Sequence, residues 1–312
     1  MSPIATAALA KTAPPAPPRR RARSGPPTRR LMAPATLFLL AWMIVPLAMT
    51  LYYSVRHYNL MMPELRNFVG ATNYKLLLTD PTFWHSLVNT LVLVMACLAI
   101  TVALGLGLAL LFNRTFPGRG VARTLAISPF FVMPVVTGLI WKNMLFHPVY
   151  GLLAWLAREL GLAPFDWLAQ QPMLSIVIMI AWEWTPFALL ILLTGLQSLP
   201  EDQIEAARLD GAGRWQEFRH IVVPHLGQVL YVVVMLESIF FLTSFAEIYA
   251  TTSGGPGTAT TNLPYYIYQN AFFQYDIGLS SAAAVGAVVL ANVFSFFLIR
   301  FVAGNLNAGS AR

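Results

Sequence analysis

Ionisable side chains inside long apolar stretches are the residues of this sequence most able to do chemistry. Glu183 lies between Trp182 and Trp184, and Glu237 lies in another apolar stretch. An ionisable group inside a membrane-spanning segment is costly and usually functional. A carboxyl group beside flat aromatic faces could bind a neutral polyhydroxylated molecule. Further candidates for such a pathway are Thr243, Ser244, Asn89 and Asn292.

A structural explanation of the same residues stays open. Glu183 or Glu237 could hydrogen-bond a neighbouring helix or a partner chain, because a carboxyl group in a membrane must find a partner. The two tryptophans could face lipid. Glu247 lies near the expected outer end of its stretch, where we expect it to be solvated.

A polar segment between two apolar stretches carries the second pattern. Ser198, Pro200 and Glu201 resemble a helix start with a capping box, so a short helix is expected to begin near Leu199. Gly211 can end that helix or admit another backbone. A second helical piece should follow, with Pro224 closing it. Two short helices at an angle, with small residues at the elbow, could dock into a partner or rest on the membrane. The candidate docking residues are Glu205, Ala206, Ala207, Arg208, Gly211, Ile221 and Pro224.

Apolar stretches long enough to cross a membrane make up most of the chain. Of the 312 residues, 57% are hydrophobic and 11% are charged, whereas about 25% are charged in a soluble domain. About 20 apolar residues span a bilayer. The sequence therefore predicts an all-α membrane protein with six transmembrane helices, at Leu31–Tyr53, Trp84–Phe112, Thr124–Phe146, Met173–Leu196, Val229–Ala250 and Ser280–Val302.

Three parts follow along the chain. Residues 1–30 form an N-terminal arm rich in Pro, Ala and Arg, which is expected to be disordered. Residues 31–302 form the membrane domain, including the patterned inner loop (197–226). Residues 303–312 form a C-terminal tail.

The basic side chains predict the orientation. They crowd the N-terminal arm, and alternation of the loops puts most of the others on the same side. The outer loops hold only Arg56, Arg66, Lys75 and Arg158. This positive-inside bias predicts that both termini are cytoplasmic. The net charge of +7 is then a topology signal with some attraction to lipid headgroups, and no nucleic-acid partner is expected.

The sequence argues against an enzyme. Cys97 is the only cysteine and lies inside the second predicted span, so it forms no internal disulfide and no cysteine metal site. We predict no catalytic residues and no metal ligands, because no H-E-x-x-H motif or hydrolase triad is recognisable. None of Lys11, Lys75 and Lys142 follows a glycine, so a phosphate-binding G-K-[ST] loop is absent.

The inner loop resembles that of the permeases of binding-protein-dependent ABC importers. Their loop reads E-A-A, three residues, G, nine residues, I-x-L-P. Here Glu205-Ala206-Ala207 precedes Gly211, and Ile221-Val222-Val223-Pro224 ends the pattern, with Val223 where the family usually has Leu. The segments Thr252–Gly257 and Gly278–Ala282 look like those of carbohydrate permeases, most like the sorbitol and mannitol kind.

The resemblance implies a permease in the bacterial cytoplasmic (inner) membrane that moves a sugar or sugar alcohol by alternating access. It implies the inner loop as the coupling helix that docks on a separate ABC ATPase dimer, which uses ATP and Mg²⁺. This chain itself would hold no cofactor. The implied partners are a second permease subunit of different sequence, which would form a heterodimer with this chain, an extracytoplasmic solute-binding protein and membrane lipid. The alternative is an ion-gradient-driven secondary transporter, with Glu183 and Glu237 as proton sites.

Overall fold

The computed structural model describes residues 28–62, 64 and 66–310. The chain divides into two compact units between Ala48 and Met49, and each is described by itself. Helix α1 (Thr28–Ser54) supplies residues 28–48 to the first unit, and its side chains from Phe38 to Val45 are exposed. Residues 1–27 of the arm predicted to be disordered lie outside the described residues.

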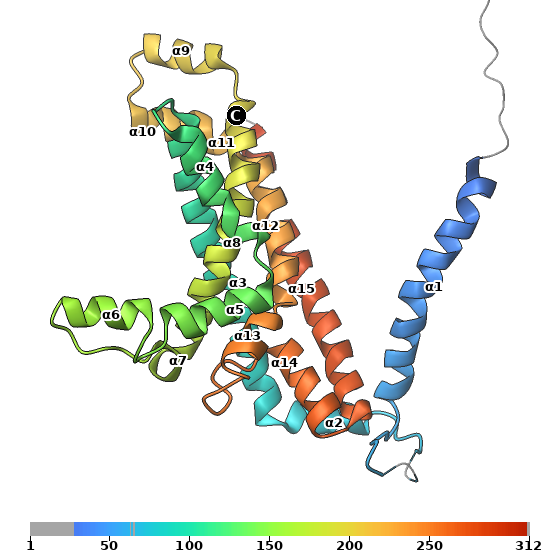
Figure 1. The fold of residues 1–312 in the computed structure, drawn as a ribbon. Coiled ribbons are helices and arrows are strands. Elements are labelled where there is room, and N and C mark those ends of the chain that lie inside the picture. Colours follow the sequence, from blue (N-terminus) through green and yellow to red (C-terminus); the bar gives the residue numbers. More distant parts are fainter. Residues whose placement is uncertain (1–27, 63, 65, 311–312) are drawn as a thin grey trace, which may run out of the picture. The chain divides into compact units, whose positions relative to one another are not determined.

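Four long helices form the body of the second unit (Figure 1). Helix α3 (Pro81–Asn113) packs along α8 (Pro172–Gln197), and α12 (Gly227–Leu242) contacts both. Helix α15 (Ile277–Ser310) packs against α12 and continues past Val302, where the sequence predicts the last span to end. The prediction of an all-helical fold is confirmed. Long apolar runs form helices because a helix satisfies its own backbone polar groups in lipid.

Close contacts between α3 and α8 hold the core. A Cβ atom added to Gly105 would lie 2.6 Å from Cβ of Ala188, so the glycine lets the two backbones approach. Leu93, Cys97 and Ile180 are fully buried in one apolar cluster around these helices. Cys97 is a free cysteine.

The third predicted span is broken, which the sequence did not predict. Helix α4 (Arg119–Ile127) runs into a 3₁₀ turn that ends at Phe131, and α5 (Pro134–Ile140) then starts in a direction bent by 105°. Met133 is extended, with φ −68° and ψ 139°, as expected for the residue before a proline. A π-helical turn, Trp141–Leu145, extends α5.

The fifth predicted span is also shorter than expected. Helix α12 ends at Leu242, and the short helix α13 (Ala246–Thr251) follows after a break. The side-chain amide of Asn262 donates to the carbonyl of Ser244 at 2.5 Å. This bond satisfies a backbone acceptor at the break, which a continuous helix would have paired with one of its own amides. Among the described residues, four helices are long and apolar enough to cross a membrane, or up to six if each bent pair is one span.

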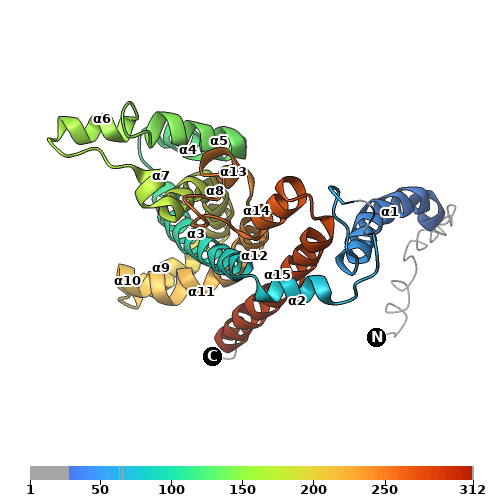
Figure 2. The same cartoon turned by 90° about the horizontal axis from the view of Figure 1, so that it is seen from below.

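Short helices cover one end of the second unit, as Figure 2 shows from below. Helix α2 (Thr72–Thr79) and α14 (Leu263–Tyr268) both pack against α15, and the turn Gln269–Phe273 continues α14. Helix α6 (Leu152–Glu159) projects sideways in both views, followed by α7 (Trp167–Gln170).

Candidate functional site

The inner loop forms two short helical pieces at the opposite end of the unit from α14 (Figure 1). Helix α9 spans Glu201–Leu209. A second piece runs through α10 (Arg214–Glu217), the π-helical turn Phe218–Val222 and α11 (Val223–His225). We call Glu201–His225 the elbow. The predicted pair of short helices is confirmed.

Gly211 ends the first helix of the elbow. Its φ is +86°, a left-handed conformation that glycine adopts without steric cost. The amide of Gly211 donates to the carbonyl of Arg208 at 3.0 Å, and the amide of Ala212 donates to that of Ala207 at 2.9 Å. This pair of bonds is the Schellman arrangement, which satisfies two terminal carbonyls of α9.

One ion pair joins the two pieces of the elbow. Arg208 donates to both carboxylate oxygens of Glu217, Nε to Oε1 at 2.8 Å and Nη2 to Oε2 at 3.2 Å. The two bonds fix both side chains in one plane, as an arginine–carboxylate pair prefers. The pair therefore links α9 to α10.

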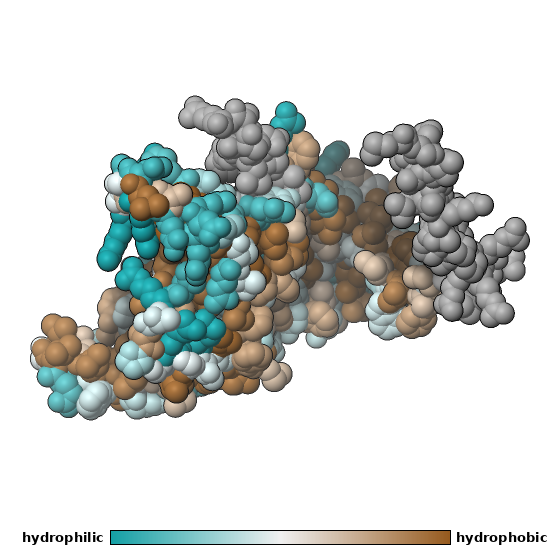
Figure 3. Space-filling view, turned by 90° about the horizontal axis from the view of Figure 1, so that it is seen from above, coloured by the Kyte–Doolittle hydropathy of each residue, from teal (hydrophilic) through white to brown (hydrophobic). Residues whose placement is uncertain are grey.

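The elbow presents almost all of its surface outward. None of α9, α10, α11 or the turn between them contains a buried residue. Leu209 is 89% exposed and Trp215 is 69% exposed. Figure 3 shows a mainly hydrophilic area over α9 and α10 with a hydrophobic spot in it. A hollow of about 380 Å³ lies at the bend, lined by Ala207, Asp210, Gly211, Ala212, Gln216, Glu217, His220 and Ile221.

The ends of the elbow are tied to α8. The Ser198 hydroxyl lies 3.1 Å from Nε2 of His225, and it donates to the carbonyl of Gly195 at 2.7 Å. The predicted capping box is therefore wrong, because Ser198 bonds back to α8 and Pro200 occupies the N-cap position. Pro224 does not close the second piece either. It lies in the first turn of α11, and the chain bends by 61° only before Gly227.

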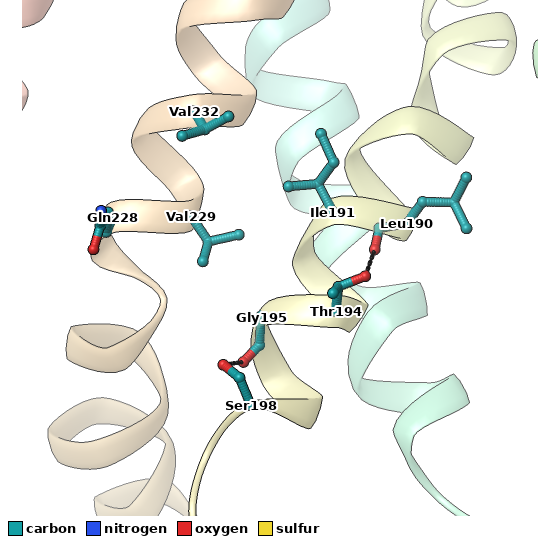
Figure 4. A pocket seen from close by; sticks show the side chains of 8 residues that line it. All are labelled: Leu190, Ile191, Thr194, Gly195, Ser198, Gln228, Val229 and Val232. Carbon is teal, nitrogen blue, oxygen red and sulfur yellow. Dashed lines mark hydrogen bonds between the residues drawn. The ribbon is translucent and has the colours of Figure 1, made fainter. Parts of the chain in front are cut away.

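An apolar hollow of about 510 Å³ lies between α8 and α12, close to these ties. Figure 4 shows Ile191 of α8 and Val229 and Val232 of α12 pointing into the space between the two helices. At its end the helices touch, because a Cβ on Gly195 would lie 2.9 Å from side-chain atoms of Leu226 and Val229. The elbow is thus attached directly to two membrane helices.

The ion pair predicts a pH response of the elbow. Arg208 holds the pKa of Glu217 below its ordinary value, chiefly through its hydrogen bond. A lowered folded-state pKa stabilises the pair at pH values above the ordinary glutamate pKa of about 4.3, and that stabilisation is lost as pH falls through the lowered value. At pH 7, Arg208→Gln should therefore speed amide hydrogen exchange in α9 and α10 a few-fold. Below the folded pKa, the variant and the wild type should exchange alike after correction for intrinsic rates. Equal exchange at pH 7 would show that the pair does not hold the elbow.

Glu237 is the most buried of the candidate pathway residues. It is fully buried, and its Oε2 accepts a hydrogen bond of 2.6 Å from the hydroxyl of Thr101 on α3. Its Oε1 is buried without a partner in the described part of the chain. The contact with Thr101 ties α12 to α3, which fits the structural explanation for this residue.

Glu183 also points into the protein. It is 3% exposed, and its Oε2 has no hydrogen-bond partner in the described part of the chain. Its two neighbours face other ways. Trp182 packs edge-on against Trp141 at 5.7 Å between ring centres, whereas Trp184 lies 4.5 Å from the ring of Phe240. The carboxyl group and the tryptophan faces therefore do not meet in one site within this chain.

Trp184 is instead part of an aromatic group that sequence reasoning missed. Its ring contacts Phe130, Phe187 and Phe240 at centre-to-centre distances of 4.5–5.8 Å. Phe240 is 46% exposed. Part of the signal was available, because Phe187 lies three residues after Trp184 and therefore on the same helix face.

The polar residues near the break after α12 are held by their neighbours. Thr243 is exposed and donates to the carbonyl of Phe240 at 2.9 Å. Ser244 is nearly buried and donates to Oε2 of Glu247 at 3.0 Å. Glu247 is only 4% exposed, so the expectation that it is solvated is wrong. The break in the fifth span lets α13, which carries Glu247, pack against α5 and α8.

The two asparagine candidates make structural contacts. The amide of Asn89 donates at 3.0 Å to the carbonyls of Thr258 and Thr261 and so anchors the loop that contains them to α3. Asn292 is exposed on α15 and donates to the carbonyl of Val288 one turn earlier. No group of three metal-ligating side chains occurs in the described ranges.

Comparisons with known proteins agree on a family. The family described as binding-protein-dependent transport system inner membrane component matches residues 25–307. The trehalose/maltose transport system permease protein MalF of Thermococcus litoralis is 34% identical over 276 residues, covering 88% of this chain and 92% of the relative. The sn-glycerol-3-phosphate transport system permease protein UgpA of Agrobacterium fabrum is 31% identical, covering 89% and 95%.

The fold also matches a solved structure. A chain in the crystal structure of a bacterial alginate ABC transporter, bound to an alginate pentasaccharide-loaded periplasmic protein, superimposes with a TM-score of 0.75. The match covers 89% of this chain and 94% of that one, at 20% sequence identity. This similarity shows the fold.

Proposed function

The chain belongs to the family of binding-protein-dependent transport system inner membrane components, and from this premise we propose that it imports a neutral sugar or sugar alcohol. A member of this family is a non-catalytic, multi-pass permease subunit of the inner membrane that carries no cofactor. The proposed partners are a second permease of different sequence, an ABC ATPase dimer and an extracytoplasmic binding protein. The elbow and both termini would face the cytoplasm.

The exposed elbow is the observation that carries this proposal. A nine-residue helix is marginal in water without packing, yet α9 buries no side chain in this chain. Leu209 of α9 and Trp215 of α10 are exposed apolar side chains of the kind that bury in a partner's pockets. We propose the ATPase as that partner, with Glu205, Ala206, Ala207, Arg208, Gly211, Ile221 and Pro224 in or near the contact.

The attachment of the elbow suggests how docking moves the pathway. Closure of the ATPase dimer on ATP would push the elbow. His225, the last residue of the elbow, contacts Ser198 and the carbonyl of Gly195 at the end of α8. The chain then bends directly into α12. These two helices carry Trp184 and Phe240 at their contact. Movement of α8 against α12 would therefore change the access to this aromatic group, as alternating access requires.

The substrate class follows from the residues on these helices. We propose that the group of Phe130, Trp184, Phe187 and Phe240 contacts the apolar face of a sugar as it passes. Helices α3, α8 and α12 contain no lysine or arginine, whereas a phosphate ester would call for basic groups. Lys142 already donates to the carbonyl of Thr251 at 2.7 Å. A neutral sugar of the trehalose or maltose kind, or a polyol such as sorbitol or mannitol, fits better than glycerol 3-phosphate.

Uptake into right-side-out membrane vesicles tests the proposal, with inverted vesicles as the control. We expect uptake of one of maltose, trehalose, sorbitol, mannitol or xylitol that needs the binding protein, stops when ATP is depleted and survives an uncoupler. Uptake that collapses with the uncoupler and survives ATP depletion would identify a secondary transporter. Buried carboxyl groups such as Glu237, with one unpartnered oxygen, would then be its proton sites.

The aromatic group gives a prediction of its own. Trp184→Ala should raise the KM of uptake about tenfold or more, since a lost aromatic anchor typically costs over 1 kcal/mol, and Trp184→Phe should restore part of it. Trp182→Ala is the matched control, because this neighbour faces Trp141 instead. Equal KM values for the two alanine variants would remove Trp184 from the pathway.

A further inference from the structure

An aromatic cluster lies at the end of the second unit opposite the elbow (Figure 1). Its centre is Tyr268 of α14. The ring of Tyr268 lies 5.5 Å from that of Tyr249 on α13, 5.0 Å from that of Phe272 and 5.6 Å from that of Phe273. On its inner side it contacts Phe245 at 5.0 Å. Figure 2 shows α13 and α14 close together on this face.

The outer rings of this cluster are open. Tyr249 is 46% exposed, Phe272 64% and Phe273 63%. The inner support is rigid, because Tyr265 is 2% exposed and contacts both Phe245 and Tyr268. Rings held by other rings form a preorganised surface, and preorganisation lowers the entropy lost on binding. We call Tyr249, Tyr268, Phe272 and Phe273 the outer platform.

The composition around the platform indicates its ligand. The stretch from Tyr249 to Tyr275 contains no charged residue but many hydroxyl and amide side chains. Ser253 and Gln274, at its two edges, are exposed. A protein-binding surface carries a polar, often charged rim, and a membrane-interface segment typically adds Lys or Arg. Aromatic faces with neutral hydroxyl and amide neighbours match a molecule that has both apolar C–H faces and hydroxyl groups.

We propose that the outer platform is a carbohydrate-binding subsite at the outer mouth, separate from the aromatic group around Trp184. A pyranose ring would stack on Tyr249 and Phe272. The tyrosine hydroxyls, with Ser253 and Gln274, would form hydrogen bonds with the hydroxyl groups of the sugar. The assignment rests on the proposed sugar import. The platform follows the break between α12 and α13 and begins nine residues beyond Phe240, so it would hold the sugar before that sugar reaches Trp184.

Direct binding is the first test. The assembled complex in lipid nanodiscs, without binding protein, is mixed with millimolar maltose, and saturation-transfer NMR reports on the ring protons. We expect transfer to maltose in the wild type and in Tyr249→Phe, and its loss in Tyr249→Ala and Phe272→Ala. Tyr275→Ala is the matched control, since Tyr275 is 44% exposed and lies outside the platform. Transfer that is absent in the wild type, or equal in all variants, overturns the proposal.

Transport is the second test. Tyr249→Ala and Phe272→Ala should raise the KM of uptake roughly five- to tenfold, the loss typical of one aromatic contact. A weaker affinity for unloaded binding protein, with the maltose signal intact, would mean that the platform docks that protein and would overturn the sugar assignment. If the wild type transports no sugar, the proposed function fails, and the NMR result alone then decides whether the platform binds carbohydrate.

Discussion

Replacing Gly211 with tryptophan is expected to abolish assembly with the ATPase while the chain still inserts and folds. Gly211 has φ +86°, and nothing lies within 4 Å of an added Cβ atom. The added Cβ atom would therefore meet no atom of this chain, and the indole would block the hollow at the bend of the elbow. The left-handed conformation adds a cost of about 1–2 kcal/mol for a side chain with Cβ. Co-purification of the ATPase with the permease measures the effect.

Two controls separate the causes. Gly211→Ala adds the backbone cost without the bulk, so it should weaken co-purification only partly. Gly118→Trp matches the change elsewhere, because Gly118 also has a positive φ of +80° with no atom within 4 Å of its Cβ position. Gly118 precedes α4 and is not in the elbow. Normal assembly and transport by Gly211→Trp would refute the coupling assignment.

Replacing Gly105 with leucine is expected to prevent stable folding. An added Cβ atom would lie 2.6 Å from Cβ of Ala188, 3.1 Å from the backbone nitrogen of Leu189 and 3.2 Å from the carbonyl carbon of Ala188. Two of these atoms belong to the backbone of α8, which can move only by separating the helices. Overpacking typically costs about 1–3 kcal/mol, and a backbone clash in the main helix contact should reach the upper end or exceed it.

Gly107 provides the matched control on the same helix. Nothing lies within 4 Å of its Cβ position, so Gly107→Leu should leave folding unchanged. The yield of monodisperse protein in detergent and the thermal unfolding midpoint compare the two variants. A Gly105→Leu protein as stable as Gly107→Leu would contradict the packing of α3 on α8.

Helix length and apolar composition predicted the parts of the fold that depend on local sequence alone. The runs at α3 and α8 leave no alternative to a long helix, so both appear within a few residues of their predicted bounds. The breaks depend on distant partners. The bent α5 packs on α13, where a Cβ atom added to Gly138 would lie 3.0 Å from Cβ of Ala250. No local pattern reveals that contact.

The candidate site divides in the same way. Gly211 and its spacing from Glu205 predicted a helix end, because a left-handed C-terminal residue is a local requirement. Which way a side chain points from a membrane helix depends on its neighbours. Glu183 and Trp184 are adjacent in sequence, yet one is buried and the other contacts Phe240. Hydropathy treats all faces of an apolar helix alike, so it could not separate them.

The ATPase activity of the reconstituted complex tests the central claim most directly. The complex would contain this chain, its partner permease, the ATPase and the binding protein, and the sugars to compare are sorbitol, mannitol, xylitol, maltose, trehalose and glycerol 3-phosphate. We predict stimulation by one neutral sugar that requires the binding protein and is lost in Gly211→Trp but kept in Gly118→Trp. Failure to assemble with any ATPase, together with uptake driven by an ion gradient, would contradict the account.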